Sequence, residues 1–263
     1  AKDGRIVDLA LVRKNKARDL IEDFMVASNV TIAKFLEASG RSGIRRVVRE
    51  PERWSRIVQL AEKFGATLPA EPDAFALAQF LKAQRAADPD RFPDLSLSIV
   101  KLLGPGLYAL DLPGKDPGGH FSLATHDYSH ATAPNRRYAD LITQRLVKAT
   151  LAKSAAPYSD TDLSAVAQRC TEREDAARKV ERQVRKTAAA LLLGDRIGQT
   201  FDGIVTGVTP KGTFVRTFHP PAEGRVMRGQ EGMDVGEKVR VKLLSTEPEK
   251  GFIDFQGVWQ AKP

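Results

Sequence analysis

The stretch GHFSLATHDYSHATAPNRRYADLITQRLVK, residues 119–148, joins a polar loop to a helix-forming segment. Pro134 suits the first position of a helix, and apolar residues then recur at helical spacing, so we predict a helix from Pro134 to about Lys153. Arg136 and Arg137 then fall in its first turn, where cations oppose the helix dipole. Exposed amides and guanidinium groups together bind phosphate. The segment is therefore either a phosphate site or a salt-bridged helix start.

Upstream, residues 16–39 carry apolar side chains at three- and four-residue spacing, which predicts an amphipathic helix with Asn15 as its N-cap. Glu22 and Asn29 lie seven residues apart on one face, either as a flank touching water or as a polar pair aimed into a groove. We expect further elements in the order of the chain: an extended basic segment 41–51, helices 52–64 and 72–87, an apolar element from 95, a loop 104–119 and a strand 120–128. A helix then begins at Asp162 and continues or restarts through Leu193. Its apolar stripe consists of Val180, Val184, Ala188 and Leu191.

After Gly194 the apolar period changes from helical to alternating. Five short segments separated by Gly, Pro and Asp turns predict a closed five-stranded barrel of OB type. We therefore expect an α+β chain, with a mainly helical domain over 1–194 and the barrel over 195–263. Four ring-bearing residues fall where such barrels expose stacking surfaces for bases, although some of them belong to the barrel core, and we expect about half to be exposed: Phe201, Phe214, Phe218 and His219.

The net charge of +8 over 263 residues suggests a polyanionic partner. Eight basic and eight acidic residues balance between Gln199 and Gln256, so the excess lies in the helical part, as either a solvated surface or a clustered groove. The single cysteine, Cys170, excludes a disulfide framework and fits a reducing compartment. No apolar run approaches the ~18 residues of a membrane span, and the first residues do not resemble a signal peptide, so we expect a cytoplasmic protein.

Candidate metal ligands are weak in this sequence. His120, His126, His130 and Asp127 lie close together, but their spacing matches no zinc pattern. The aspartates at 88, 90 and 94, and at 160 and 162, stand in turn or capping contexts. We therefore expect no metal centre in this chain.

Residues 119–148 resemble the hallmark of the RNase II/RNase R family (the RNB domain), GHFGLA followed by Y-x-H-F-T-S-P-I-R-R-Y-x-D-L-x-x-H-R. ARDLIEDFMVASNVTIAKFL, IRRVVREP and TEREDAARKVERQV resemble its other motifs, and the terminal barrel is similar to an S1 domain. The differences are Val48 and Gln144 in place of histidines, Asn135 in place of an apolar residue, and Ala131-Thr132-Ala133 in place of F-T-S.

The resemblance implies part of a processive 3′→5′ exoribonuclease that hydrolyses single-stranded RNA to nucleoside 5′-monophosphates with Mg²⁺. The family's four metal-binding aspartates belong to the first half of the RNB domain. This chain resembles only the second half, so it implies the N-terminal half as a partner. By position, the family's roles fall on Arg136 for the scissile phosphate, Arg137 as its structural or phosphate-binding neighbour, Tyr138 and Asp140 for orientation, Glu22 for the terminal nucleotides and Glu181 for the 3′ end.

Two competing classes carry no chemistry. The first is a module that binds single-stranded RNA through the barrel and the basic face. The second is a double-stranded DNA binder, which fits the charge but lacks a recognisable recognition helix.

Overall fold

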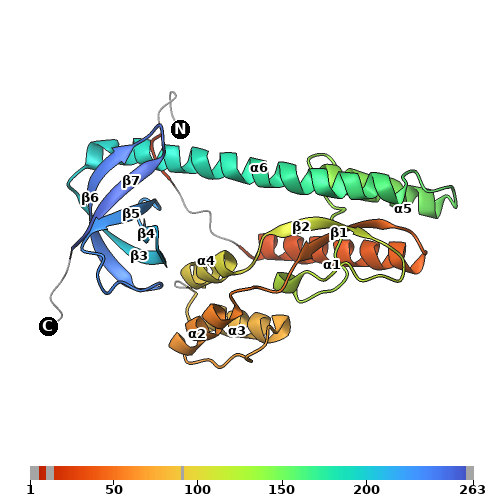
Figure 1. Cartoon of the computed structure of the whole chain (residues 1–263), viewed down its shortest axis with the longest axis horizontal. Coiled ribbons are helices and arrows are strands. Elements are labelled where there is room, and N and C mark those ends of the chain that lie inside the picture. Colours follow the sequence, from red (N-terminus) through yellow and green to blue (C-terminus); the bar gives the residue numbers. More distant parts are fainter. Residues whose placement is uncertain (1–5, 10–14, 90–91, 259–263) are drawn as a thin grey trace. The chain divides into compact units, whose positions relative to one another are not determined.

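The computed structural model describes residues 6–9, 15–89 and 92–258, apart from the side chain of Asp94. The chain divides into two compact units, Lys14–Asp175 and the remainder, and helix α6 (Asp160–Leu193) belongs to both. The α+β class is confirmed, because the described residues form six α-helices, a two-stranded sheet and a closed five-stranded barrel (Figure 1). The boundary expected at 194–198 follows the end of α6, whereas the two units divide inside this helix.

The first unit is built on a β-hairpin covered by helices. Its main elements are α1 (Lys16–Ala38), β1 (Gly43–Val48), β2 (Gly106–Asp111), α5 (Tyr138–Leu151) and the start of α6. The Asn15 side chain accepts from Arg18 N at 3.0 Å, so the expected N-cap of α1 is confirmed. β1 pairs antiparallel with β2, and Leu36, Ile44 and Ile142 pack among α1, β1 and α5.

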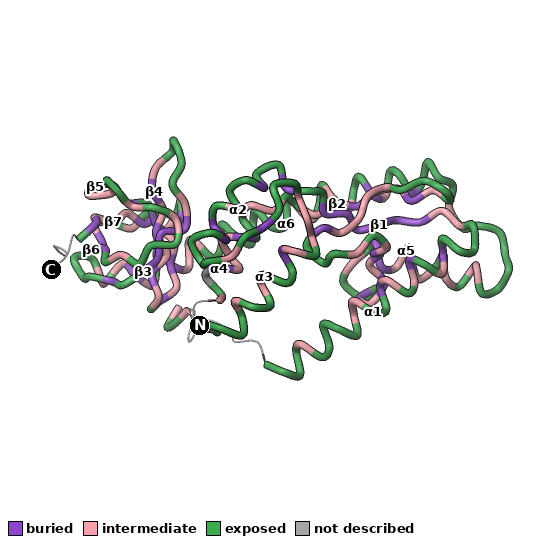
Figure 2. The backbone as a smooth tube through the Cα atoms, turned by 90° about the horizontal axis from the view of Figure 1, so that it is seen from below, coloured by how far each residue is buried: buried purple, intermediate pink, exposed green. Residues whose placement is uncertain are grey.

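Strand β1 is buried along its whole length, including two arginines (Figure 2). Arg46 donates to both carboxylate oxygens of Glu174, at 2.6 and 3.0 Å, and lies 4.7 Å from the ring centroid of Tyr108. A Cβ at Gly106 would stand 2.6 Å from this guanidinium, so glycine leaves the space that Arg46 fills. Arg45 donates to Asp111. The charges of β1 are thus compensated inside the protein, as buried charges must be.

A second core holds three short helices together: α2 (Trp54–Lys63), α3 (Ala74–Ala87) and α4 (Phe92–Leu102). Trp54, Ile57, Phe80 and Ile99 are buried in it, and Phe121 from a later loop meets Trp54 edge to face at 5.9 Å. This core fixes one end of that loop. None of the helices in the described ranges is long and apolar enough to cross a membrane.

Three expectations for the first unit are wrong. The stretch 104–119 contains β2, whose pairing partner lies far away in the sequence. Residues 120–128 form a 3₁₀ turn, Phe121–Leu123, and isolated bridges rather than a strand, because Ala124 adopts a left-handed conformation with φ of 49°. Helix α5 begins at Tyr138, not Pro134, because the amides of Arg136 and Arg137 both donate to Ala133 O in a preceding turn.

The second unit contains the expected barrel: β3 (Thr200–Thr209), β4 (Gly212–Thr217), β5 (Glu223–Arg228), β6 (Lys238–Glu247) and β7 (Phe252–Val258). The order β3-β4-β5-β7-β6 closes through the β3–β6 pair, and the five strands are confirmed. Ala189, Ala190 and Leu193 at the end of α6 pack into the barrel core.

The apolar stripe expected on the later part of α6 is not buried. Val180, Val184 and Leu191 are exposed at 64%, 61% and 54%. The barrel instead meets Gln183 and Thr187, which donate to the carbonyls of Lys250 and Pro248.

Candidate functional site

The loop between β2 and α5 carries the polar motif and rests on the open edge of β1. Arg46 N donates to Tyr128 O at 2.7 Å, and Val48 N donates to Gly119 O at 3.1 Å. Arg45 adds a bond to His126 O at 3.1 Å and pairs with Asp127. The loop is therefore fixed by its backbone although it has little regular secondary structure.

Arg136 and Arg137 lie side by side in sequence but in different environments. Arg136 is exposed and makes no ion pair with any residue that the structure describes. Arg137 is the N-cap residue of α5, and its guanidinium donates to Asp140 Oδ1 at 2.7 Å and to Thr132 Oγ1 at 3.4 Å. Asp140 is fully buried and also accepts from Ala133 N at 2.8 Å. Arg136 is thus open to an anion, whereas Arg137 is bound to the protein.

Glu22 and Asn29 both lie on α1 but differ in their exposure to solvent. Glu22 is exposed, as expected for a residue that faces a ligand. Asn29 is only 1% exposed, because its Nδ2 donates to Tyr128 Oη at 3.2 Å and its Oδ1 accepts from Ala131 N at 2.9 Å. This corrects the expectation that both side chains face a groove, since the loop covers α1 at Asn29.

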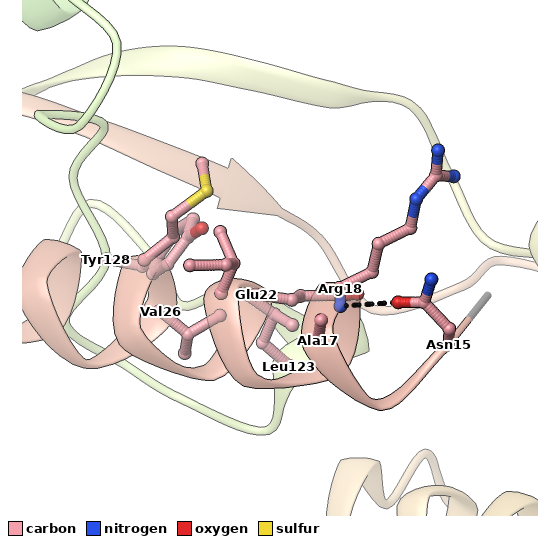
Figure 3. Close-up of a pocket in the computed structure, with 9 residues that line it drawn as sticks. Asn15, Ala17, Arg18, Glu22, Val26, Leu123 and Tyr128 are labelled. Carbon is pink, nitrogen blue, oxygen red and sulfur yellow. Dashed lines mark hydrogen bonds between the residues drawn. The ribbon is translucent and has the colours of Figure 1, made fainter.

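A pocket of about 570 Å³ lies between the start of α1 and this loop (Figure 3). Its walls are mostly apolar, with Glu22 and Arg18 as charged residues. The lining residues are Asn15, Ala17, Arg18, Ile21, Glu22, Met25, Val26, Leu123 and Tyr128. Leu123 and Tyr128 of the loop both belong to the pocket wall, and Tyr128 also accepts the bond from Asn29.

His120, Tyr128 and His130 of the loop cluster with Tyr108 of β2. Tyr108 Oη and His130 Nδ1 are 2.9 Å apart, and the Tyr128 ring meets His120 and His130 edge to face. Burial, reinforced by the charge of Arg46, lowers the pKa of His120 to about 4. Burial, with the charges of Arg137 and Arg46, lowers the pKa of His130 to about 3. Both imidazoles are therefore neutral near pH 7.

The described residues do not fit a resident divalent metal. No group of three or more His, Cys, Asp or Glu side chains gathers within these ranges. Asp127 is paired with Arg45, Asp88 is the C-cap of α3, and Asp162 accepts from Ser159. Asp90 and the side chain of Asp94 lie outside what the structure describes.

Two further candidates lie on helices α5 and α6. Tyr138 is the first residue of α5 and is 56% exposed. Glu181 lies on α6, where it accepts from Arg185 at 2.6 Å, and its side chain remains 60% exposed. Glu181 and Arg136 belong to different units of the chain.

The four candidate ring residues of the barrel differ in their exposure to solvent. Phe201 is 5% exposed in the core, with the guanidinium of Arg196 4.7 Å from its ring centroid, which corrects its expected role as a stacking surface. Phe214 and Phe218 are half-buried, and His219 is exposed. Phe214 stands directly opposite Arg225 on the neighbouring strand, on the outward parity of β4. The alternation of GRVMR also places Arg225 on the outward face of β5.

Comparisons with known proteins agree with this arrangement. Residues 1–153 match the RNB domain, and residues 199–258 match the RNase II-type exonuclease C-terminal S1 domain. Ribonuclease R 1 of Lactococcus lactis is 27% identical over 96% of this chain and 34% of its own length, and Ribonuclease R of Escherichia coli is 28% identical over 96% and 35%. The chain thus spans about a third of the length of these curated relatives.

Solved structures share the fold. Mycoplasma genitalium RNase R in complex with ribose-methylated single-stranded RNA superposes with a TM-score of 0.78 at 21% identity, over 94% of this chain and 42% of that one. Yeast Ssd1, described as a pseudonuclease, gives a TM-score of 0.65 at 20% identity, over 84% and 28%.

Proposed function

Since the chain belongs to the RNB domain family, we propose that it is the C-terminal part of a processive 3′→5′ exoribonuclease that hydrolyses single-stranded RNA to nucleoside 5′-monophosphates in the cytoplasm. The observation that carries the proposal is Arg136, an exposed guanidinium on a loop that is otherwise fixed by buried bonds. A preorganised cation of this kind stabilises a phosphate without moving during the reaction.

Each candidate residue takes a role that its environment allows. Arg136 holds the scissile phosphate, and Arg137 supports it through Asp140. Glu22 contacts the terminal nucleotides from its pocket, where the apolar wall suits a base. Tyr138 and Glu181, both exposed, contact RNA near the phosphate and the 3′ end.

The outer face of the barrel extends the RNA-binding surface. We assign base stacking to Phe214, Phe218 and His219, with Arg225 beside Phe214 for the backbone. Because the barrel segment carries balanced charge, stacking supplies more of its affinity than ion pairing does.

Hydrolysis needs a partner in this proposal. The complete enzyme binds Mg²⁺, and its carboxylate ligands belong to the N-terminal half of the RNB domain, outside this chain. Leu20 and Phe24 on α1 are 55% and 62% exposed and provide an apolar face suited to pack against that half.

The second candidate is a single-stranded RNA-binding module without catalysis. It is favoured by the lack of a carboxylate cluster among the described residues and by the likeness in fold to a pseudonuclease.

The two candidates are distinguished with 5′-labelled single-stranded RNA and Mg²⁺, with and without a purified N-terminal half of an RNB domain. We expect binding by the chain alone and a ladder of 3′-shortened products only with the added half. In the complete enzyme, Arg136→Ala should lower turnover far more than it weakens RNA binding, whereas Arg56→Ala, an exposed arginine on α2, should change neither. Shortening by the isolated chain refutes the metal assignment, and unchanged turnover in Arg136→Ala refutes the phosphate assignment.

A further inference from the structure

The backbone of Ala131 is held on both sides by amide side chains from two different helices. Asn29 Oδ1 on α1 accepts from Ala131 N at 2.9 Å, and Gln144 Nε2 on α5 donates to Ala131 O at 2.8 Å. Ala131 is 0% exposed and Asn29 is 1% exposed. Because one bond holds the preceding peptide group and the other holds the following one, the pair restricts both backbone torsions of this residue.

The restricted residue stands at the root of the segment that presents Arg136. Two residues later, Ala133 N donates to Asp140 Oδ1 at 2.8 Å, and Ala133 O accepts from the amides of Arg136 and Arg137. The path from Ala131 to Arg136 is therefore a short chain of fixed points. The Arg136 guanidinium makes no ion pair with the described residues, so its position follows from the backbone that Asn29 and Gln144 hold at Ala131 and Asp140 holds at Ala133.

We propose that Asn29 and Gln144 are positioning residues that set where the Arg136 guanidinium meets an RNA phosphate. The inference rests on the proposed function, because it requires Arg136 to bind phosphate. In this proposal the two uncharged amide side chains affect RNA affinity without touching the RNA.

The two amides differ in a way that separates their effects. Asn29 also donates to Tyr128, which lines the pocket that contains Glu22. Loss of Asn29 should disturb both the pocket and the loop, whereas loss of Gln144 should disturb the loop alone. Gln144 is therefore the cleaner test.

The test is a double-mutant cycle on the whole chain, read by fluorescence anisotropy of a short 5′-labelled single-stranded RNA over a range of salt. We expect Arg136→Ala to weaken binding about tenfold, the loss of one charge-assisted bond. Gln144→Met, which keeps the length of the side chain but removes its donor, should weaken binding about fivefold. The double variant should bind no more weakly than Arg136→Ala alone, because Gln144 acts only through Arg136.

The salt dependence gives a readout that general destabilisation does not move. In Arg136→Ala and in the double variant the slope of log affinity against log salt should become shallower by about 0.7, the contribution of one phosphate contact to a single strand, and in Gln144→Met it should become shallower by part of that amount. Gln84→Met, a half-buried glutamine on α3, is the matched control and should leave both affinity and slope unchanged.

Each outcome decides one point. Wild-type affinity in Gln144→Met, or a loss that adds fully to that of Arg136→Ala, overturns the positioning role. Wild-type affinity in Arg136→Ala overturns the phosphate assignment of the proposed function instead. If Gln144→Met does not fold, hydrogen exchange in the unmodified chain decides, because the Ala131 amide must be protected before RNA is added, and fast exchange there overturns the inference.

Discussion

The contribution of Arg45 to the stability of the first unit can be measured, because its one buried guanidinium forms ion pairs with three carboxylates. Its side chain is 3% exposed, while those of Asp111, Asp127 and Glu37 are 9%, 24% and 47% exposed. Pairs with exposed partners contribute about 0–1 kcal/mol, so the Glu37 pair matters little. Removing the partner of a buried charge costs about 3–5 kcal/mol. Arg45→Met should therefore lower the free energy of unfolding of the first unit by that amount, chiefly through Asp111.

The assay is urea unfolding followed by Trp54 fluorescence, in a Trp259→Phe background so that Trp54, buried in the first unit, reports alone. Arg85→Met is the control, because its pair with Asp19 is exposed and should contribute less than about 1 kcal/mol.

The pH dependence supplies an independent check. Burial raises the pKa of Asp111 above its ordinary value, and Arg45 opposes that rise. Without Arg45 the pKa rises further, so native Arg45→Met binds a proton that its unfolded state releases above pH 3.8. Its deficit relative to the unmodified chain should shrink from pH 7 to pH 5. A loss no larger than that of Arg85→Met, or a deficit independent of pH, would refute this reasoning.

Three further predictions concern titration, stacking and packing. The pKa values of His120 and His130 are lowered to about 4 and about 3, whereas unfolded histidine titrates near 6.5. The unfolded chain therefore takes up protons first, and stability should fall from pH 6.5 to pH 5 by at most about 1.4 kcal/mol per pH unit for each histidine. Urea titrations of His130→Phe should show a shallower slope, and an unchanged slope would contradict the pKa shift. Phe214→Ala should weaken single-stranded RNA binding by about 1–3 kcal/mol, whereas Phe201→Ala should chiefly lower the melting temperature of the barrel, and the reverse pattern would exchange their roles. Ile142→Ala, at a fully buried position, should cost about 2–5 kcal/mol of unfolding free energy, and a smaller loss by urea unfolding would show that this core collapses around the gap.

Local patterns predicted the parts of the fold that local physics determines. The barrel strands follow from a two-residue period between glycine turns, and the start of α1 follows from the Asn15 cap. The sequence does not predict strand β2, because its partner lies more than fifty residues upstream and alternation within its few residues is weak.

The errors at the candidate site have a common origin in tertiary contacts. A shared helix face linked Glu22 with Asn29, but the sequence does not show where a distant loop covers that face. Phe201 and Phe214 are both plausible barrel rings, and only strand register assigns one to the inside and one to the outside. Helix α5 starts later than the sequence predicts because Ala133 O accepts from the amides of both Arg136 and Arg137 in a turn before the helix.

The attachment of residues 119–133 to β1 has a consequence for how this region resists opening. A segment without helix or strand is ordinarily the first part of a domain to exchange its amides or to be cut by a protease. Here the bonds of Arg46 N to Tyr128 O and Val48 N to Gly119 O tie it to a completely buried strand. The amides in these two bonds belong to β1, so lifting the loop would uncover them while the β1–β2 ladder stays closed. Slow exchange at Arg46 N and Val48 N should therefore report how rarely the loop leaves the strand.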